Sequence, residues 1–373
     1  IAQCLVGSEM CIRDRYIILP LLFTSCIGCE NKEHDTPAPE PNERELSKYE
    51  PEDGKCFVFI GQDLGAVGGL EQYNEGYCDH FQTPAGITVY LGLGGSDTDK
   101  VSGLYDIDNW GSGDCCANLY PQSERFNNSM IAVGLAIVGN ETDIASGKYD
   151  RKLDIIGEWF KKLAPRPVFL RIGYEFDGTD WNHYVPETYI PAYKHIKDHF
   201  DAAGIHNVAY VWQSKGDGTP LSDMQKWYPG DEYVDWCAYS YFGQPDQVMI
   251  EFARMKGKPV FIAESTPVFQ KGQTYFDADI KKPEIARKIW DEWFTKFFSV
   301  IEKNSDVVKA FSYINVEWLS QPMWIVNVTF QQCDSRIQQS EYVSNHWKEK
   351  VSGNGYIPVS YTHLRAHETL SDL

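Results

Sequence analysis

The chain has 373 residues, of which 43% are hydrophobic, and a formal net charge of −19 at pH 7. The length and composition suit one large globular domain, and the acidic balance argues against a nucleic-acid partner, because phosphate binding needs a basic face. The 11 Trp and 22 Tyr leave two explanations open at this stage, a large core and a cleft in which sugars stack.

The two ends of the chain do not continue any pattern beside them. Residues 1–15 and 359–373 both resemble translated sequencing-adapter sequence, so neither is expected to belong to the fold. Residues 16–29 resemble the end of a bacterial lipoprotein signal peptide that is truncated at its start. Cys26 is the expected lipidated residue and Cys29 the alternative, while a plain secretory signal is the other interpretation.

Residues 30–54 are polar and Pro-rich, with almost no apolar side chains. Such a composition buries too little surface to order itself, so it predicts a disordered tether. Tether and lipid anchor together predict an exported protein, either a lipoprotein of the cell surface or periplasm, held at the outer membrane, or a secreted protein. We expect it to be a monomer.

From residue 55 to residue 352 the chain repeats one unit, a short apolar run followed by a loop and usually by a helical pattern. The eight runs are Phe57–Asp63, Ile87–Leu93, Met130–Ile137, Pro167–Glu175, Asn207–Ser214, Val234–Phe242, Pro259–Ser265 and Val308–Glu317. Continuous apolar runs of this length are typical of strands that are buried on both faces of a parallel sheet.

Amphipathic helical patterns lie between several of these runs. They span Tyr149–Ala164, Pro186–Ala203, Pro245–Lys256 and Pro283–Lys303, whereas the helices after the first, second and fifth runs are less clear. Eight strands with interleaved helices over about 300 residues predict an α/β fold of the TIM (β/α)8 barrel type. A doubly wound sheet is the main alternative, but it rarely needs eight parallel strands.

The cysteines of this region do not have the spacing of a zinc site. One or two disulfides are plausible in an exported protein, and Cys56 with Cys78 is one candidate pair. Cys237 lies within a strand-like run, so we expect it to be a buried thiol.

Barrel enzymes carry their sites at the carboxyl ends of the strands, where this chain collects polar and aromatic residues. These groups, and some in the loops that follow, are candidate sugar contacts, because aromatic faces stack on sugars and amides bind hydroxyls. The candidates are Gln62, Asp63, Arg171, Tyr174, Asp177, Trp181, His183, Trp212, Gln213, Tyr239, Tyr241, Phe242, Asn315, Trp318 and Trp324.

Two glutamates end the fourth and seventh strands, on opposite sides of the predicted barrel mouth. Glycoside hydrolysis needs one protonated and one ionised carboxyl, so Glu175 is the candidate acid/base and Glu264 the candidate nucleophile. Aromatic neighbours are expected to raise the pKa of Glu175, and Tyr241 to donate a hydrogen bond to Glu264. Alternatively, such a glutamate caps a helix or pairs with Arg171. Strand alternation turns Glu317 away, so we treat it as structural.

The chain has no phosphate loop, no dinucleotide-binding glycine pattern and no nucleophile elbow. No predicted strand ends in histidine, as a metal-dependent barrel hydrolase would require. We therefore expect no cofactor and no metal.

Residues 57–347 resemble glycoside hydrolase family 26, in clan A, and within it the β-1,3-xylanases more than the β-mannanases. The matching segments are residues 61–63, 83–88, 118–121, 166–178, 211–213, 227–242, 258–266, 289–294 and 311–318. The resemblance implies a retaining, endo-acting enzyme with Glu175 as acid/base and Glu264 as nucleophile.

The chain departs from the mannanase pattern at two positions. Tyr174 stands where mannanases usually have His, and Ser240-Tyr241-Phe242 stands where they tend to have Asp-x-Tyr. The loop at 176–184 is longer than we expect for the xylanases, and residues 94–100 have no clear match. We expect β-1,3-xylan as the substrate, with β-1,4-mannan or another marine matrix glycan as alternatives. A surface glycan-binding lipoprotein without catalysis is the competing class.

Overall fold

A computed structural model describes residues 45–216, 219–268, 278–327, 329–330 and 333–358. The chain divides at residue 43, and all described residues belong to the second unit, residues 44–373. The predicted lipidation site at Cys26, both adapter-like ends and the first part of the tether lie outside the described residues.

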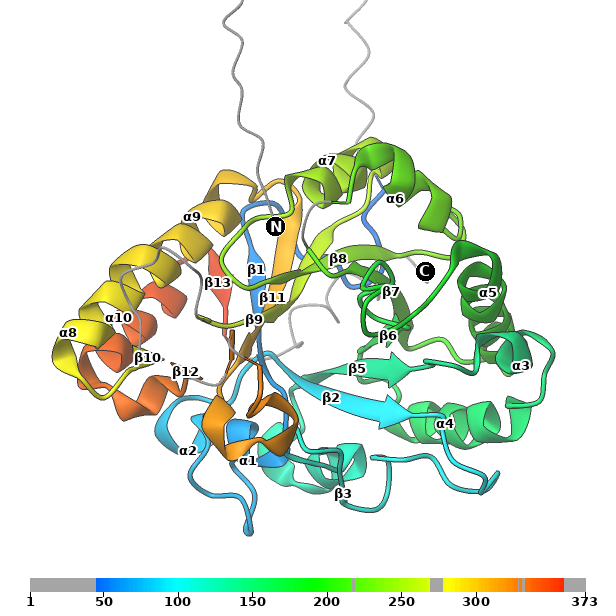
Figure 1. The fold of residues 1–373 in the computed structure, drawn as a ribbon, viewed down its shortest axis with the longest axis horizontal. Coiled ribbons are helices and arrows are strands. Elements are labelled where there is room, and N and C mark those ends of the chain that lie inside the picture. Colours follow the sequence, from blue (N-terminus) through cyan, green and yellow to red (C-terminus); the bar gives the residue numbers. More distant parts are fainter. Residues whose placement is uncertain (1–44, 217–218, 269–277, 328, 331–332, 359–373) are drawn as a thin grey trace, which may run out of the picture. The chain divides into compact units, whose positions relative to one another are not determined.

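The eight predicted strands are all present, and they form a closed parallel barrel (Figure 1). They are β1 (Cys56–Gly61), β2 (Gly86–Gly92), β5 (Met130–Ala136), β6 (Val168–Ile172), β7 (Val208–Ser214), β8 (Trp236–Tyr241), β9 (Val260–Ser265) and β11 (Val308–Ile314). Each strand pairs with the next, and β11 pairs back onto β1 to close the ring. The TIM barrel prediction is therefore confirmed.

Helices surround the strands as an outer ring (Figure 1). The longer ones are α4 (Asp150–Leu163), α5 (Pro186–Ala202), α7 (Gln247–Lys256), α9 (Thr295–Lys303) and α10 (Glu341–Val351). The predicted helix at 283–303 is divided into α8 (Pro283–Ile289) and α9 by a π-helical turn over Trp290–Phe294. No helix in the described part of the chain is long and apolar enough to cross a membrane.

The helices that the sequence left unclear are short. After β1 come α1 (Leu64–Val67) and α2 (Tyr77–His80), and after β7 comes α6 (Leu221–Trp227). The segment after β2 forms a small hairpin of β3 (Asp108–Asn109) and β4 (Asp114–Cys115), then 3-10 turns. One or two helical turns contain too few residues to establish a 3.6-residue period, which explains why the pattern was weak there.

Large aromatic side chains fill the barrel interior near the amino-terminal ends of the strands. Phe59, Phe169 and Phe261 meet there with ring centroids 4.9–6.0 Å apart, together with Trp236. The amino-terminal end of this core is covered by residues 45–54, which we had assigned to the tether. Tyr49 lies 6.1 Å from Phe169, ring to ring, so the ordered domain begins earlier than the sequence predicted.

The cysteine pairing considered from the sequence is wrong. Cys56 and Cys78 are both buried free thiols, as are Cys115 and Cys116. Cys237 is a buried thiol in β8, as expected, and its burial raises its pKa to about 12. Packing rather than covalent cross-linking therefore holds these segments together.

The barrel core gives a stability prediction. Replacing Phe169 with Ala should lower the free energy of unfolding by about 3–5 kcal/mol, because the cavity cannot be refilled from a ring of fixed strands. Urea unfolding followed by tryptophan fluorescence measures this loss. Val326→Ala, at a side chain that is 84% exposed, is the matched control and should change stability by less than about 0.5 kcal/mol. Equal effects of the two substitutions would contradict the assignment of Phe169 to the core.

Candidate active site

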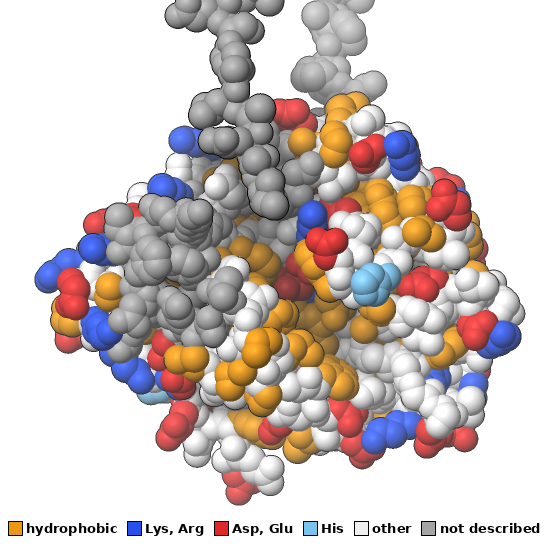
Figure 2. Space-filling model, in the orientation of Figure 1, with side chains coloured by type: hydrophobic (Ala, Val, Ile, Leu, Met, Phe, Trp, Pro, Cys, Tyr) orange, Lys and Arg blue, Asp and Glu red, His pale blue; other side chains and the backbone are white. Residues whose placement is uncertain are grey.

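The carboxyl ends of the barrel strands carry the two glutamates. Glu264 lies within β9, and Glu175 follows β6 in a turn. The space-filling view shows acidic side chains in a hollow near the middle of this face, with hydrophobic side chains at its border (Figure 2).

An irregularity in β9 turns Glu264 toward the barrel interior. Phe261 and Ala263 already face inward, so simple alternation would point Glu264 outward with Ile262. The register shifts here against both neighbouring strands: Tyr239 pairs with Ile262, but Ser240 pairs with Glu264. A β-bulge of this kind inserts one residue and reverses the facing of those that follow. The bulge therefore places the carboxyl of Glu264 inside the ring.

A buried arginine holds Glu264. Nη2 of Arg171 donates to Oε1 of Glu264 at 2.5 Å, and Nε2 of Gln213 approaches the same oxygen at 3.4 Å. Nε of Arg171 donates to Oε1 of Gln213 at 2.8 Å, so the three side chains form one network. Both Arg171 and Gln213 are fully buried. They therefore orient Glu264 from the barrel interior. The sugar contacts that we predicted for Arg171 and Gln213 are wrong.

Two tyrosine rings enclose the guanidinium of Arg171. Its central carbon lies 5.1 Å from the ring centroid of Tyr90 and 5.2 Å from that of Tyr174. The hydroxyl of Tyr90 accepts from Nη2 of Arg171 at 3.4 Å. Gly134 makes this packing possible, because a Cβ there would lie 2.6 Å from the ring of Tyr90 and 3.3 Å from that of Tyr174.

Glu175 occupies a left-handed turn at the end of β6. Its φ is 55°, a conformation that residues other than glycine rarely adopt and that often occurs at functional sites. The backbone carbonyl of Glu175 accepts from the amide of Gly178 and from Nδ2 of Asn182, at 2.8 and 2.9 Å. The loop that follows Glu175 therefore fixes the turn.

The carboxyl of Glu175 has two side-chain donors. Oγ of Ser240 donates to Oε1 at 2.6 Å, and Nε1 of Trp181 donates to Oε2 at 3.1 Å. Burial, followed by the negative charge of Glu264, raises the pKa of Glu175 to about 8, although the Ser240 hydrogen bond acts in the opposite direction. Glu175 is therefore mostly protonated at neutral pH.

A hydrogen-bond path joins the two carboxyls. Ser240 contacts Glu175 at 2.6 Å, Gln213 contacts Ser240 at 3.1 Å, and Gln213 contacts Glu264 at 3.4 Å. These short links keep the two carboxyls within the ~10 Å that hydrolytic carboxyl pairs span.

Three predicted sugar contacts lie outside the barrel wall, and those assignments are wrong. Trp212, Tyr239 and Tyr241 are at most 1% exposed and belong to the core between strands and helices. Trp212 stacks on Phe176 with centroids 4.3 Å apart. Tyr241 packs against Trp293 rather than donating to Glu264, because Ser240 is the inward-facing residue at this point of β8.

Three further candidates hold loops together. The side chain of Asn315 is fully buried, and it donates to the carbonyl of Ala66 and accepts from the amide of Ile337. The carboxylate of Asp177 accepts from Ser214, Thr219 and the amide of Lys215. Trp318 is 1% exposed and packs against Trp324. The structure contradicts a direct sugar contact for Asn315, Asp177 and Trp318.

The remaining candidates stay predictions. Trp181 is 50% exposed, His183 is exposed, and Tyr174, Phe242 and Trp324 are half-buried. Gln62 and Asp63 are 9% and 7% exposed at the end of β1.

The carboxylate of Asp63 has a structural role of its own. It caps α1 through the amide of Ala66 and accepts from Gln321, and burial raises its pKa to about 6.

Sequence reasoning missed Ser240, Tyr90 and Asn182. Ser240 is two residues after the inward-facing Ala238, and Tyr90 is two residues after Thr88, which is hydrogen-bonded to Ser312 of β11. Alternation along each strand was therefore a signal that could have found both. Asn182 lies in a loop and has no such signal.

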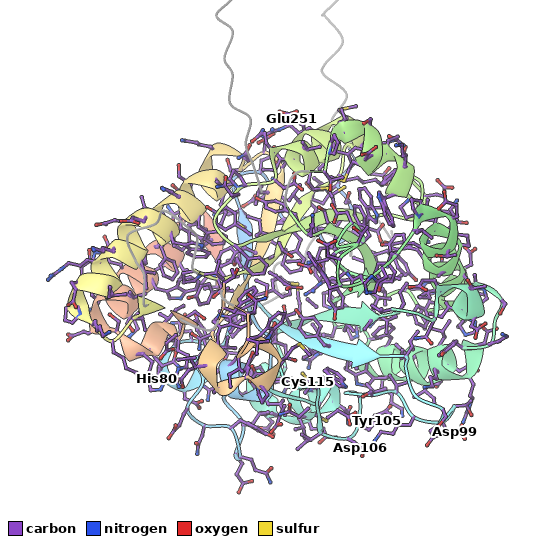
Figure 3. All side chains as sticks on the ribbon, in the orientation of Figure 1. His80, Asp99, Tyr105, Asp106, Cys115 and Glu251 are labelled. Atoms are coloured by element: carbon purple, nitrogen blue, oxygen red, sulfur yellow. The ribbon has the colours of Figure 1, made fainter. Side chains whose placement is uncertain are left out.

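An apolar rim borders the site on the side of β2 and β11. Its members are Trp110, Leu319, Met323, Ile325 and Val326, all at least 37% exposed. The amide of Met323 donates to the carbonyl of Gly111 at 2.8 Å, so the loop after β11 rests on the segment after β2. Tyr105 and Asp106 lie on that segment too (Figure 3). A group of exposed apolar side chains beside a site is typical of a binding surface.

Comparisons with known proteins identify the family of the chain. A family model described as glycosyl hydrolase family 26 matches residues 125–307. A β-1,3-xylanase from Alcaligenes sp. is 30% identical over 330 residues, which cover 83% of this chain and 66% of the relative. The β-1,3-xylanase TXYA from Vibrio sp. is 30% identical over 328 residues, with coverages of 83% and 67%. The chain thus spans about two thirds of the length of these relatives.

Solved structures show the same fold. A family 26 β-mannanase from Bacteroides ovatus superposes with a TM-score of 0.54 at 15% identity, covering 82% of this chain and 91% of that one. GH26C from Muricauda sp. MAR_2010_75 gives the same TM-score and identity, with coverages of 82% and 88%. The closed barrel, the two linked carboxyls at its strand ends and these relatives together place the chain in the class of glycoside hydrolases. Within that class, the chain belongs to glycosyl hydrolase family 26.

The coupling between the two carboxyls is testable. Replacing Glu264 with Gln should lower the pKa of Glu175, since it removes a neighbouring negative charge and leaves the charge of Arg171 uncompensated. Carbon-13 NMR titration of the Glu175 carboxyl measures the change. Glu317→Gln removes a carboxylate that Arg336 binds at 3.0 Å and should leave the pKa where it is. An unchanged pKa in Glu264→Gln would contradict the coupling.

Proposed function

We propose that the chain is an endo-acting glycoside hydrolase that works by the retaining mechanism, with Glu175 as acid/base and Glu264 as nucleophile. The proposal rests on one observation: Glu175 and Glu264, which hydrogen bonds link, have opposite electrostatic environments. A buried cation lies 2.5 Å from Glu264, whereas Glu175 is half-buried beside another carboxylate and its pKa is raised to about 8. One group is thus prepared to attack as an anion and the other to give up a proton.

The first half of the reaction forms a covalent intermediate. Glu175 transfers its proton to the glycosidic oxygen as the bond to the anomeric carbon breaks, and the carboxylate of Glu264 bonds to that carbon. Arg171 and Gln213 keep Glu264 in one orientation, so the attacking oxygen is positioned before the substrate arrives.

The second half releases the sugar. Glu175 is now ionised and takes a proton from a water molecule, whose oxygen attacks the anomeric carbon and displaces Glu264. The hydrogen bond from Ser240 stabilises the anionic form of Glu175 during this interval. Ser240 and Trp181 therefore assist the group in alternating between its two protonation states.

We place sugar rings against Trp181 and the apolar rim. The indole of Trp181 is half-exposed while its nitrogen binds Glu175, so a ring stacked on it would lie next to the acid/base. The apolar rim offers further surface on the opposite side of the mouth, toward β2 and β11. Contacts on both sides of the carboxyl pair support cleavage within a chain.

We propose β-1,3-xylan as the substrate. Two relatives at 30% identity are named β-1,3-xylanases, and Tyr174 and Ser240 stand where we expect His and Asp in mannanases. Ser240 binds Glu175 directly and Tyr174 stacks on Arg171, so these departures lie at the reacting groups themselves. We also propose, on the sequence of residues 16–29, export as a lipoprotein.

A glycan-binding protein without catalysis is the alternative class. Such a protein gains nothing from a buried arginine that orients one carboxylate beside a second carboxyl that is kept protonated. The network around Arg171 therefore favours the enzyme.

Substitution of the two glutamates tests the mechanism. Glu264→Ala should reduce kcat to background, while polysaccharide binding persists. Glu175→Ala should lower kcat by about 10²–10⁴-fold on polysaccharide, and azide should restore part of the rate on substrates with a good leaving group. Glu317→Ala, which lies outside the network, is the control. Normal turnover by Glu264→Ala would reject its role, and absence of azide rescue would reject that of Glu175.

A panel of polysaccharides tests the substrate. We expect the highest kcat/KM on β-1,3-xylan, with oligosaccharides rather than single sugars as the early products in chromatography. β-1,4-Mannan, β-1,4-xylan and mixed algal glycans complete the panel. Preference for β-1,4-mannan would contradict the proposed substrate but leave the proposed retaining mechanism standing. Binding without turnover on every polymer would support a glycan-binding protein without catalysis.

A further inference from the structure

A cluster of histidines and aspartates joins two helices of the outer ring. Asp150 and Asp154 are four residues apart on α4, and His195 and His199 are four residues apart on α5. Side chains at this spacing share one face of a helix. The two helices present these faces to each other: Nε2 of His195 lies 2.6 Å from Oδ1 of Asp150, and Nε2 of His199 lies 2.9 Å from Oδ1 of Asp154.

We propose that Asp150, His195 and His199 bind a divalent transition-metal ion, Zn²⁺ in the first place. One potential ligand atom from each of the three side chains lies within 4.8 Å of the other two. Bond lengths of about 2.0–2.2 Å place the donors of a tetrahedral zinc site roughly 3.3–3.5 Å apart. The pair distances from Oδ1 of Asp150, 2.6 Å to His195 and 3.8 Å to Nδ1 of His199, lie on either side of that value.

The hydrogen bond from His199 to Asp154 is a second, independent feature of the site. When Nε2 carries the proton for this bond, Nδ1 is left with a lone pair, 3.8 Å from Oδ1 of Asp150. Two acceptors at this distance repel, and a cation bound to both removes the repulsion. A carboxylate that binds the far nitrogen of a ligating histidine is the usual support of a zinc site.

The donor set selects the kind of ion. Two imidazole nitrogens and one carboxylate suit Zn²⁺, Ni²⁺ or Co²⁺, whereas Ca²⁺ and Mg²⁺ prefer oxygen ligands. The side chains of His195 and His199 are 28% and 19% exposed, and that of Asp150 is 43% exposed. Solvent therefore reaches the site, and water can supply the fourth ligand.

The position of the site indicates a structural role. The helices α4 and α5 flank β6 in sequence, and the turn that carries Glu175 lies between β6 and α5. A metal ion shared by the two helices would fasten this part of the ring, and it would not contact the substrate. The proposal is independent of the proposed function.

Titration of the untagged full chain with ZnCl₂ after EDTA treatment tests the site. We expect one strong site by calorimetry and a rise in Tm on the order of 2–8 °C. His195→Gln and His199→Gln should each abolish both signals, and Asp154→Asn should weaken binding about 10–100-fold. Co²⁺ should give the visible absorption of a tetrahedral ion in the wild-type chain and not in either His variant.

His206→Ala is the matched control, since His206 is an exposed histidine outside the cluster and should leave zinc binding unchanged. Absence of a Tm shift in the wild-type chain would overturn the proposal. A zinc-induced Tm shift in both histidine variants that is as large as the shift in the wild-type chain would also overturn it, because the zinc would then be bound elsewhere. A metal-free Tm near that of the wild type shows that each variant is folded.

Discussion

The ion pair between Arg171 and Glu264 is the interaction on which the rest of the site depends. Removing a guanidinium from water costs several kcal/mol, and this cost is recovered only where good geometry and additional hydrogen bonds satisfy the charge. Glu264, Gln213 and two tyrosine rings provide those contacts. Because the arginine is fully buried, it cannot turn toward solvent, and the carboxylate that it binds is fixed with it. The raised pKa of Glu175 follows in part from the same pair, since the charge held on Glu264 is its second largest cause.

The barrel divides its interior between stability and chemistry. Aromatic rings fill the interior near the amino-terminal ends of the strands, and hydrogen-bonded polar groups fill it near their carboxyl ends. The same strands supply both. The strained turn at Glu175 and the bulge at Glu264 both reduce the stability of the fold. The packing of the aromatic rings offsets this loss, because both irregularities lie outside the closely packed rings. A second core lies between the strands and the surrounding helices. The carboxyls are therefore held by hydrogen bonds from buried side chains, and the side chains proposed to contact the polysaccharide are exposed.

Much of the fold could be predicted from the sequence, and less of the site. Eight buried strands produce apolar runs that stand out in any parallel barrel, whereas helices of one or two turns leave no period to detect. Glu175 and Glu264 were selected because they end strands, but that criterion also selected Trp212 and Tyr241, which face outward. Deciding which residues face inward requires the register, and the bulge in β9 changes the register without a sequence signal. We expected no metal from the cysteine spacing and the strand ends, whereas the proposed metal site lies on α4 and α5, outside both.

Gly134 has a consequence that reaches beyond its own strand. It contributes no functional group, yet the space above its Cα is occupied by the edges of Tyr90 and Tyr174, which close on the guanidinium. Even a methyl group at this position would push one ring away and change the electrostatic field that the reacting carboxyls experience. A transplant of this catalytic centre into another barrel would accordingly need a residue without a side chain at this position as well as the charged side chains. Searches for related enzymes that score only the chemically active positions would overlook this requirement.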